Sequence, residues 1–212
     1  MSYKLLVKKL MIESKKLVTR EEIKEYSSYL KISYESAIGH LLSNRYLDRI
    51  FRGIFYVNDA NERQLGKSKM TFYEILKEAL KIKGVEKWYF GLETALKFNN
   101  LTHEYFTIDF IISDKLKRPN PMKIRGHKVR FISVKKDLLL FGIKKSSIPY
   151  SDTEKTVLDI IYLGNYNGLT GLQIKNKIID YLPSCNKNKL SNYAKKYPKT
   201  VLNFLEELNE IH

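Results

Sequence analysis

The feature that most constrains the fold is a pair of apolar runs flanking Arg52-Gly53. Residues 47–51 and 54–57 are rich in β-branched and aromatic side chains, and a glycine between such runs supplies the positive φ of a tight hairpin. Before them, apolar residues recur at the helical period over residues 3–16, 20–30 and 34–45. The order helix, helix, turn, helix, hairpin is typical of a winged helix-turn-helix, which we predict for residues 1–60.

Capping residues mark the starts of the second and third helices. Thr19 is followed three positions later by Glu22, the pattern of a capping box, in which each side chain accepts a hydrogen bond from the other residue's backbone N–H. Ser33 is expected to cap the third helix after a turn at Lys31-Ile32. The short turn between the two helices makes the third one the candidate recognition helix.

A recognition helix needs exposed polar side chains near its N-terminus and apolar residues behind them. Glu35 can accept a hydrogen bond from a cytosine amino group, or it can simply stabilise the helix N-terminus. An arginine at a hairpin tip can reach the minor groove or its phosphates, and a solvated turn is the alternative. The predicted DNA-binding residues are Ser33, Tyr34, Glu35, Ser36, His40, Ser43, Arg49 and Arg52. Other basic residues of the segment are expected to be generic surface charge: Lys8, Lys9, Lys15, Lys16 and Arg20.

Charge favours a polyanionic partner. The chain of 212 residues carries 38 Lys and Arg against 23 Asp and Glu, a formal net charge of +15. Lysine or arginine on a phosphate releases condensed counterions, although a Lys-rich surface can also serve solubility alone. The lone Cys185 excludes an internal disulfide and suits a reducing compartment. Without a signal-peptide pattern or a membrane-spanning apolar run, we expect a cytoplasmic protein.

The remainder predicts an α+β domain over residues 70–212 with a helical C-terminal tail. It follows a polar segment at 58–70 that is either a linker or a linker plus the start of a helix. Helices are expected after Thr71 and Asp152, at 92–98, and at 170–181, 187–196 and 199–210. Strands are expected at 88–90 and 105–112, and a hairpin at 123–134. Basic residues gather on that hairpin, either as a surface for DNA or an acidic protein or as a solvated sheet: Lys123, Arg125, Lys128 and Arg130.

Acidic residues of the second part are expected to be structural. Asp152 is a helix N-cap, and Lys155 with Asp159 forms an i,i+4 pair worth a few tenths of a kcal/mol. A metal-dependent nuclease would use Asp109 and the Ser133-Val-Lys135 strand, but serine stands where the second carboxylate is needed. The four histidines lack ligand spacing, and there is no glycine-rich phosphate loop. We therefore expect no catalytic residues, no metal and no cofactor, and do not expect an enzyme.

Three stretches carry a resemblance to a known family. They are Ile50-Phe-Arg-Gly-Ile-Phe-Tyr-Val57, Tyr89-Phe-Gly-Leu-Glu-Thr-Ala-Leu96 and Ser151-Asp-Thr-Glu-Lys-Thr-Val-Leu-Asp159. With them the chain resembles the AbiEi-type antitoxin family, which are winged-helix transcriptional regulators paired with a nucleotidyltransferase-like toxin. The third stretch is the most specific, and Lys155 stands where that family commonly has arginine.

The resemblance implies an autorepressor that binds an inverted-repeat operator in double-stranded DNA and whose second domain opposes a toxin. A palindromic operator needs two DNA-binding domains, which a dimer or two monomers bound side by side would supply. Three alternatives remain open from the residues alone. The chain could be a stand-alone regulator, a protein-interaction module that neutralises a toxin without a major DNA role, or a metal-dependent nuclease.

Overall fold

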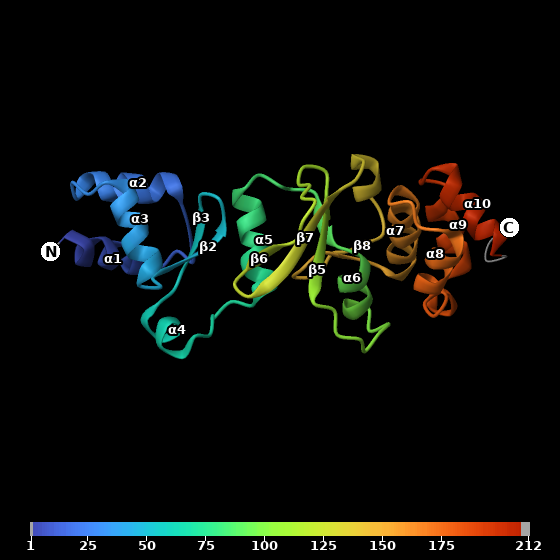
Figure 1. The fold of residues 1–212 in the computed structure, drawn as a ribbon, viewed down its shortest axis with the longest axis horizontal. Coiled ribbons are helices and arrows are strands. Elements are labelled where there is room, and N and C mark those ends of the chain that lie inside the picture. Colours follow the sequence, from blue (N-terminus) through green and yellow to red (C-terminus); the bar gives the residue numbers. More distant parts are fainter. Residues whose placement is uncertain (1, 209–212) are drawn as a thin grey trace. The chain divides into compact units, whose positions relative to one another are not determined.

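The computed structural model describes residues 2–208 and has the mixed α+β fold that the sequence predicts (Figure 1). The chain forms two compact units. The first runs to Glu86 and includes Ile124–Gly126, and the second comprises the remaining residues. This division falls later in the chain than the linker predicted at residues 58–70, so two more helices, both within residues 60–82, belong to the first unit.

The first unit contains five helices and three strands within its described residues. The three-stranded sheet has the order β1-β3-β2 with antiparallel neighbours, and β2 and β3 form the hairpin predicted from sequence. The strand β1 lies between the first two helices and was not predicted. The elements are α1 (Ser2–Ile12), β1 (Leu17–Thr19), α2 (Arg20–Tyr29), α3 (Tyr34–Ser43), β2 (Leu47–Phe51), β3 (Ile54–Val57), α4 (Ala60–Leu65) and α5 (Phe72–Ile82).

The caps predicted for α2 and α3 are both present. Thr19 and Glu22 form the reciprocal capping box of α2, and the Ser33 side chain accepts a hydrogen bond from the backbone N–H of Ser36 at the start of α3. Lys31 takes a positive φ of 54° in the turn between these helices, and Gly53 takes 81° at the hairpin tip. The local chemistry therefore fixes where α2, α3 and the hairpin begin and end.

The central strand β3 is buried on both faces, which explains its unbroken apolar sequence. Phe55 and Val57 pack into the core made by α1, α2 and α3, the blue helices of Figure 1. Ile54 and Tyr56 point to the opposite face, and α5 packs against all three strands of the sheet. The helix α5 was expected in the second domain, but it supplies the cover that the second face of this sheet requires.

The predicted linker contains the helix α4, whose Glu62 is a hub of polar contacts. Asp59 and Glu62 form a capping box, the sequence signal that could have revealed the helix. The buried Glu62 carboxylate accepts hydrogen bonds from Lys16 Nζ (2.8 Å), Tyr56 OH (2.5 Å) and the backbone N–H of Lys69 (2.7 Å). Burial alone would raise the pKa of Glu62, but these hydrogen bonds outweigh it and hold the pKa at about 2.

We predict that Glu62→Gln removes an acid-sensitive part of the first unit's stability. The folded-state pKa lies below the ordinary value, so the contribution is present above about pH 4.5 and is lost as the pH falls towards about 2. At neutral pH the variant should lose about 1–3 kcal/mol of unfolding free energy, because Lys16 and Tyr56 lose an ionised partner. Thermal unfolding at several pH values measures this. The two proteins should converge near pH 2; a constant difference across the range contradicts the assignment.

The second unit has a mixed sheet with the strand order β6-β7-β5-β4-β9-β8. β5 pairs in parallel with β7 and antiparallel with β4, and the short strands β8 and β9 were not predicted. The elements are β4 (Trp88–Phe90), α6 (Leu92–Phe98), β5 (Ile108–Ser113), β6 (Met122–Ile124), β7 (His127–Ser133), η1 (Lys136–Leu139), β8 (Ile143–Lys144), β9 (Tyr150–Ser151), α7 (Thr153–Tyr166), α8 (Gly171–Ile178), η2 (Leu182–Ser184), α9 (Lys187–Ala194) and α10 (Lys199–Glu207).

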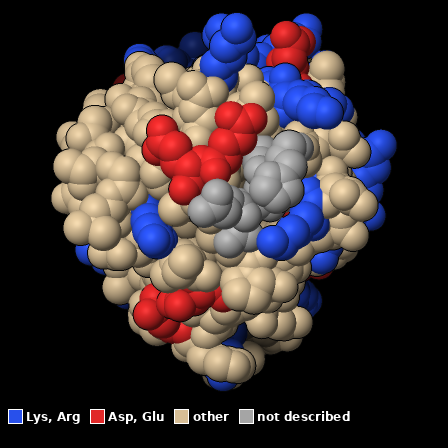
Figure 2. All heavy atoms as spheres, turned by 90° about the vertical axis from the view of Figure 1, so that its right-hand side faces the viewer, with Lys and Arg blue, Asp and Glu red and all other residues tan. Residues whose placement is uncertain are grey.

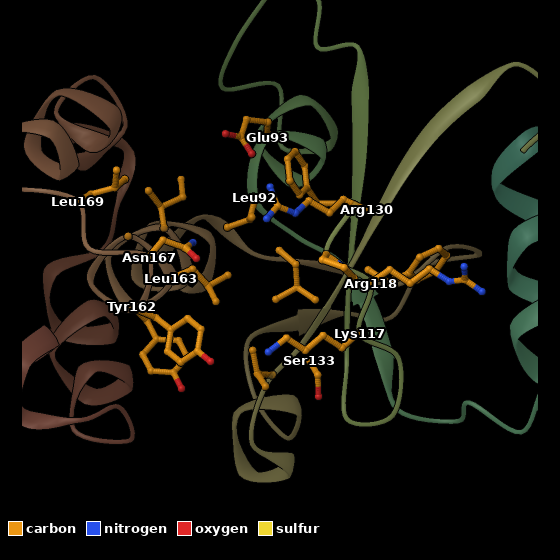
Figure 3. A pocket seen from close by; sticks show the side chains of 18 of the residues that line it. Leu92, Glu93, Lys117, Arg118, Arg130, Ser133, Tyr162, Leu163, Asn167 and Leu169 are labelled. Carbon is orange, nitrogen blue, oxygen red and sulfur yellow. The ribbon is translucent and has the colours of Figure 1, made fainter. Parts of the chain in front are cut away.

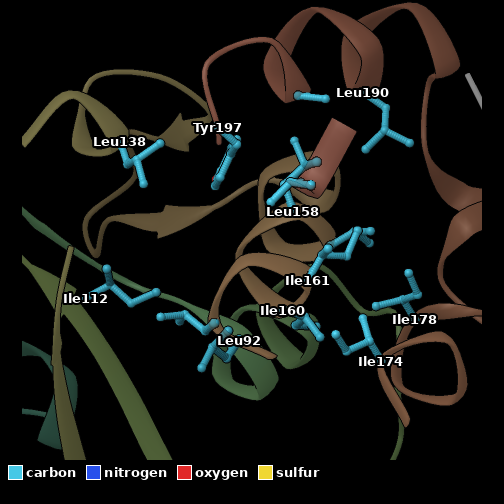
Figure 4. Packing of buried hydrophobic residues seen from close by; sticks show 14 of the residues in the cluster. Leu92, Ile112, Leu138, Leu158, Ile160, Ile161, Ile174, Ile178, Leu190 and Tyr197 are labelled. Carbon is cyan, nitrogen blue, oxygen red and sulfur yellow. The ribbon is translucent and has the colours of Figure 1, made fainter. Parts of the chain in front are cut away.

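The helix α7 forms the centre of the second core. It packs against α6, α8, α9 and α10, and Leu158 and Ile161 are completely buried in that contact (Figure 4). With 14 residues it is also the longest helix that the structure describes. Within residues 2–208, therefore, no helix has both the length and the apolar character that crossing a bilayer demands.

A buried ion pair on α7 lies within this core. Lys155 Nζ is 3.2 Å from Asp159 Oδ1 and donates to Tyr197 OH at 2.9 Å. Tyr197 donates to the same carboxylate (2.7 Å), and Tyr89 donates to its other oxygen (2.8 Å). The predicted i,i+4 pair is therefore present, but both charged side chains are 0% exposed, so the few tenths of a kcal/mol expected for it do not describe a pair in this buried position. Burial lowers the pKa of Lys155, and the neighbouring Asp159 partly offsets the shift.

We predict that Lys155→Met destabilises the second unit by about 3–5 kcal/mol, because it leaves the Asp159 carboxylate buried without its cation. The double variant Lys155→Met/Asp159→Asn keeps an acceptor for Tyr197 while removing the charge. Its free energy of unfolding should therefore exceed that of the single variant by at least about 1 kcal/mol. Calorimetric unfolding of the full chain measures both effects. A double variant that is no more stable than Lys155→Met would contradict the pairing.

Candidate nucleic-acid interface

The outward face of α3 is made of small and polar side chains. Ser33, Glu35, Ser36 and Ser43 are exposed, as predicted for a recognition helix, while the apolar side of the helix packs into the core. Gly39 lies on the same exposed face, and a Cβ added there would meet no atom within 4 Å. Sequence reasoning overlooked this glycine. The face therefore presents little bulk and leaves the helix backbone open to close approach.

Two of the predicted contact residues are engaged in packing. The His40 ring stacks on Tyr3 with ring centroids 4.5 Å apart and lies 6.2 Å from the Tyr46 ring. The half-buried Tyr34 ring lies beneath the guanidinium of Arg20 at 5.1 Å and near the ammonium of Lys24 at 5.8 Å. These rings brace α3 against α1 and α2, so the open polar edge of the helix is narrower than the sequence indicated.

Arg20 joins α3 to the hairpin. Its backbone N–H donates to the carbonyl of Gly53 at the hairpin tip (2.8 Å), and its side chain covers Tyr34 at the start of α3. Its Nε is buried and has no hydrogen-bond partner among residues 2–208. Arg20 was expected to be generic surface charge. Only the three-residue strand β1 places it beside the hairpin, and that strand gave too weak a sequence signal.

The hairpin carries the predicted arginines on its exposed parts. Arg49 shares a sheet face with its cross-strand partner Phe55 and lies over that ring at 5.8 Å, on the side where the helices pack. Arg52 is exposed at the tip and lines a shallow hollow together with Arg20, Lys83 and one acidic residue, Glu21. Three cations against one carboxylate make this hollow suitable for an anion such as a phosphate.

The basic residues predicted on the second hairpin are not a single surface. Lys128 and Arg130 alternate along β7 with the buried Val129 and Phe131, as strand geometry predicts, and Lys123 is exposed. Arg125 is different because its guanidinium pairs with Asp48, donates to Ser68 Oγ at 2.5 Å and covers the Tyr56 ring at 4.6 Å. These contacts remove Arg125 from the proposed open basic surface.

Carboxylates of the second unit have structural partners. Asp152 caps α7, as predicted, by accepting from the backbone N–H of Lys155. Glu154 pairs with Lys189 at 2.8 Å, and Asp109 on β5 lies 3.8 Å from the Nδ1 of His127. Across residues 2–208, no group of three His, Cys, Asp or Glu side chains is arranged to hold a metal ion.

Charge is distributed unevenly. Figure 2 views the face that carries the C-terminal helices, where acidic side chains form separate groups on a largely uncharged surface and basic ones lie around them. The basic side chains behind the net charge of +15 are therefore not spread evenly over the surface. A polyanion would be drawn to particular faces rather than to the whole molecule.

Comparison with known proteins supports the fold alone. The crystal structure of the RV2827C protein from Mycobacterium tuberculosis resembles this chain with a TM-score of 0.61 over 97% of this chain and 80% of that one. The two sequences are 13% identical over this match. The sequence matches no protein-family model, and a search of curated proteins found no match.

We predict that Gly39→Ala raises the unfolding free energy of the first unit by about 0.5–1 kcal/mol. Glycine in a helix interior is less favourable than alanine by that amount, and the new methyl group meets nothing. Gly53→Ala is the matched control, because its φ of 81° should make the same change destabilising. Chemical denaturation measures both. A destabilised Gly39→Ala variant would mean that this face of α3 is covered.

Proposed function

We propose that this chain is a sequence-specific DNA-binding transcriptional regulator whose N-terminal residues act as a winged helix-turn-helix. The observation that carries the proposal is the exposed face of α3 beside the arginine-tipped hairpin, with Arg20 bridging the two. The proposed activity is binding and not catalysis. It implies a cytoplasmic location, where the operator would be accessible.

In this proposal α3 enters the major groove. The groove is about 12 Å wide and a helix with its side chains measures about 10–12 Å, so the small residues on this face favour a deep approach. Glu35 would accept from a cytosine amino group, and Ser36 and Ser43 would bond to base edges or phosphates. The free N–H groups at the start of α3 would favour a phosphate there.

The hairpin would hold the DNA backbone. Arg52 and Lys83 would contact phosphates at the shallow hollow. The Nε of Arg20, which has no hydrogen-bond partner among residues 2–208, lies nearby. Arg49 would lie nearer the groove that α3 occupies, since it is on the sheet face where the helices pack. These contacts position the protein, and the α3 face would supply the sequence preference.

Gly39→Leu should abolish specific DNA binding without unfolding the protein. The added side chain has open space in the free protein but would occupy the volume that a groove edge must fill. We expect at least about a hundredfold weaker binding to the operator, as for the loss of one or two good base contacts. Fluorescence anisotropy with the region upstream of the chain's own gene measures this.

Asn176→Leu, at an exposed position of α8, is the matched control and should bind as the wild type does. Equal binding by the Gly39 variant would argue against α3 as the reading element.

Arg52→Ala should weaken binding to all DNA sequences similarly and flatten its salt dependence. Each lost phosphate contact lowers the slope of log K against log salt by about 0.9. Lys175→Ala removes an exposed charge from α8 and should leave the slope unchanged. Titrations at several salt concentrations compare the three proteins. A wild-type slope in the Arg52 variant removes the hairpin tip from the contacts.

We further propose that the regulator serves as an antitoxin-like autorepressor. Support comes from the resemblance of the stretch Ser151–Asp159 to the AbiEi-type antitoxin family. A nucleotidyltransferase-like protein encoded next to this gene would be the partner. Co-expression should restore growth that the neighbouring protein inhibits. Unrelieved inhibition would remove the antitoxin role and leave the DNA-binding role standing.

A further inference from the structure

The second unit contains a cavity of about 460 Å³ between its sheet and helix α7 (Figure 3). Its walls include apolar side chains from three sources: Leu92 at the start of α6, Phe110 and Ile132 on the strands, and Ile160 and Leu163 on α7. Pockets of about 300–1,000 Å³ with mainly apolar walls are typical of small-molecule sites. The volume and the walls therefore suit the apolar body of a small organic ligand.

Basic residues line the same cavity: Lys117, Arg118, Arg130, Lys135 and Lys177. The side chains of Lys117 and Arg130 point towards α7, whereas that of Arg118 points away (Figure 3). Lys177 pairs with the cavity's one acidic residue, Glu93, at 3.8 Å. In the part of the chain that the structure describes, no carboxylate forms an ion pair with Lys117 or Arg130. Lys117 reaches towards α7, where its ammonium lies 5.8 Å from the Tyr166 ring. The cavity thus combines an apolar interior with unneutralised positive charge.

The carboxylate of Glu93 has a buried oxygen that lacks a hydrogen-bond donor. Its Oε2 is buried and has no hydrogen-bond partner among the described residues. Buried polar atoms are usually hydrogen-bonded, and an orphan acceptor in a cavity wall needs a donor from whatever fills the space. A bound molecule with a hydroxyl or N–H group could supply it.

We infer that this cavity binds an amphipathic organic anion, with an aryl or acyl body and a carboxylate, sulfonate or phosphate head. The body would replace water against Leu92, Ile132 and Leu163, and the head would be neutralised by Arg130 and Lys117. The site lies entirely within the second unit and gives this unit a ligand-binding function of its own. It does not depend on the proposed DNA binding.

Two matched fluorophores test the inference with the full-length chain. 8-Anilino-1-naphthalenesulfonate has an aryl body and a sulfonate, and N-phenyl-1-naphthylamine has the same body without the charge. We expect saturable binding of the sulfonate at one site per chain, with an affinity about tenfold or more above that of the neutral compound, as for one charge-assisted contact. Equal affinities, or a signal that does not saturate, would overturn the inference.

Variants locate the site. Arg130→Gln and Lys117→Gln should each weaken sulfonate binding about tenfold and change binding of the neutral compound less than about twofold. Lys175→Gln, an exposed lysine that does not line the cavity, is the charge control. Asn167→Trp at an exposed position of the lining should weaken both fluorophores by filling the space. Circular dichroism verifies that each variant is folded. If the folded variants bind both fluorophores as the wild type does, the anion site is not here.

Discussion

The structure of the first unit depends on β3, a four-residue strand with no polar face. One side of it must be covered by α1, α2 and α3, and the other by α5, because both sides are apolar. This requirement sets the sheet order and carries the hairpin tip to the start of α2, where Arg20 bonds to Gly53. The relative placement of α3 and the hairpin is therefore a consequence of how β3 is buried.

A comparable constraint organises the second unit, but it is electrostatic. The Lys155–Asp159 pair is enclosed by Tyr89 and Tyr197, and an unpaired member would be costly in this environment. The pair lies on α7, the helix on which the rest of the core converges. The stretch Ser151–Asp159, which looks like a short motif in the sequence, thus combines a helix cap, a buried ion pair and core residues. These residues therefore hold α7 in place within the core.

The parts of the fold that depend on residues adjacent in sequence were predictable. The parts that depend on packing between residues far apart in sequence were not. The caps at Thr19, Ser33 and Asp152 and the turn at Gly53 depend on neighbouring residues, and all four were found where expected. The two-residue strands β8 and β9 exist only through their partners in space and left no periodic signal. The burial of Lys155 was missed for a similar reason, since i,i+4 spacing is the same on an exposed helix and in a core. At the candidate site, exposure of the α3 edge followed from its periodicity, whereas the roles of Arg20, His40 and Arg125 depend on contacts with residues far along the chain or on other elements.

We propose that α3 and the hairpin tip together form the surface that DNA occupies. Backbone amide chemical shifts of the isotope-labelled chain, followed by NMR during titration with a duplex from upstream of its own gene, test this most directly. We expect the largest shifts in residues 33–43 and 49–54, and smaller changes at the α3 face with an unrelated duplex of equal length. Shifts confined to the second unit, or none in α3 at saturating DNA, would contradict it.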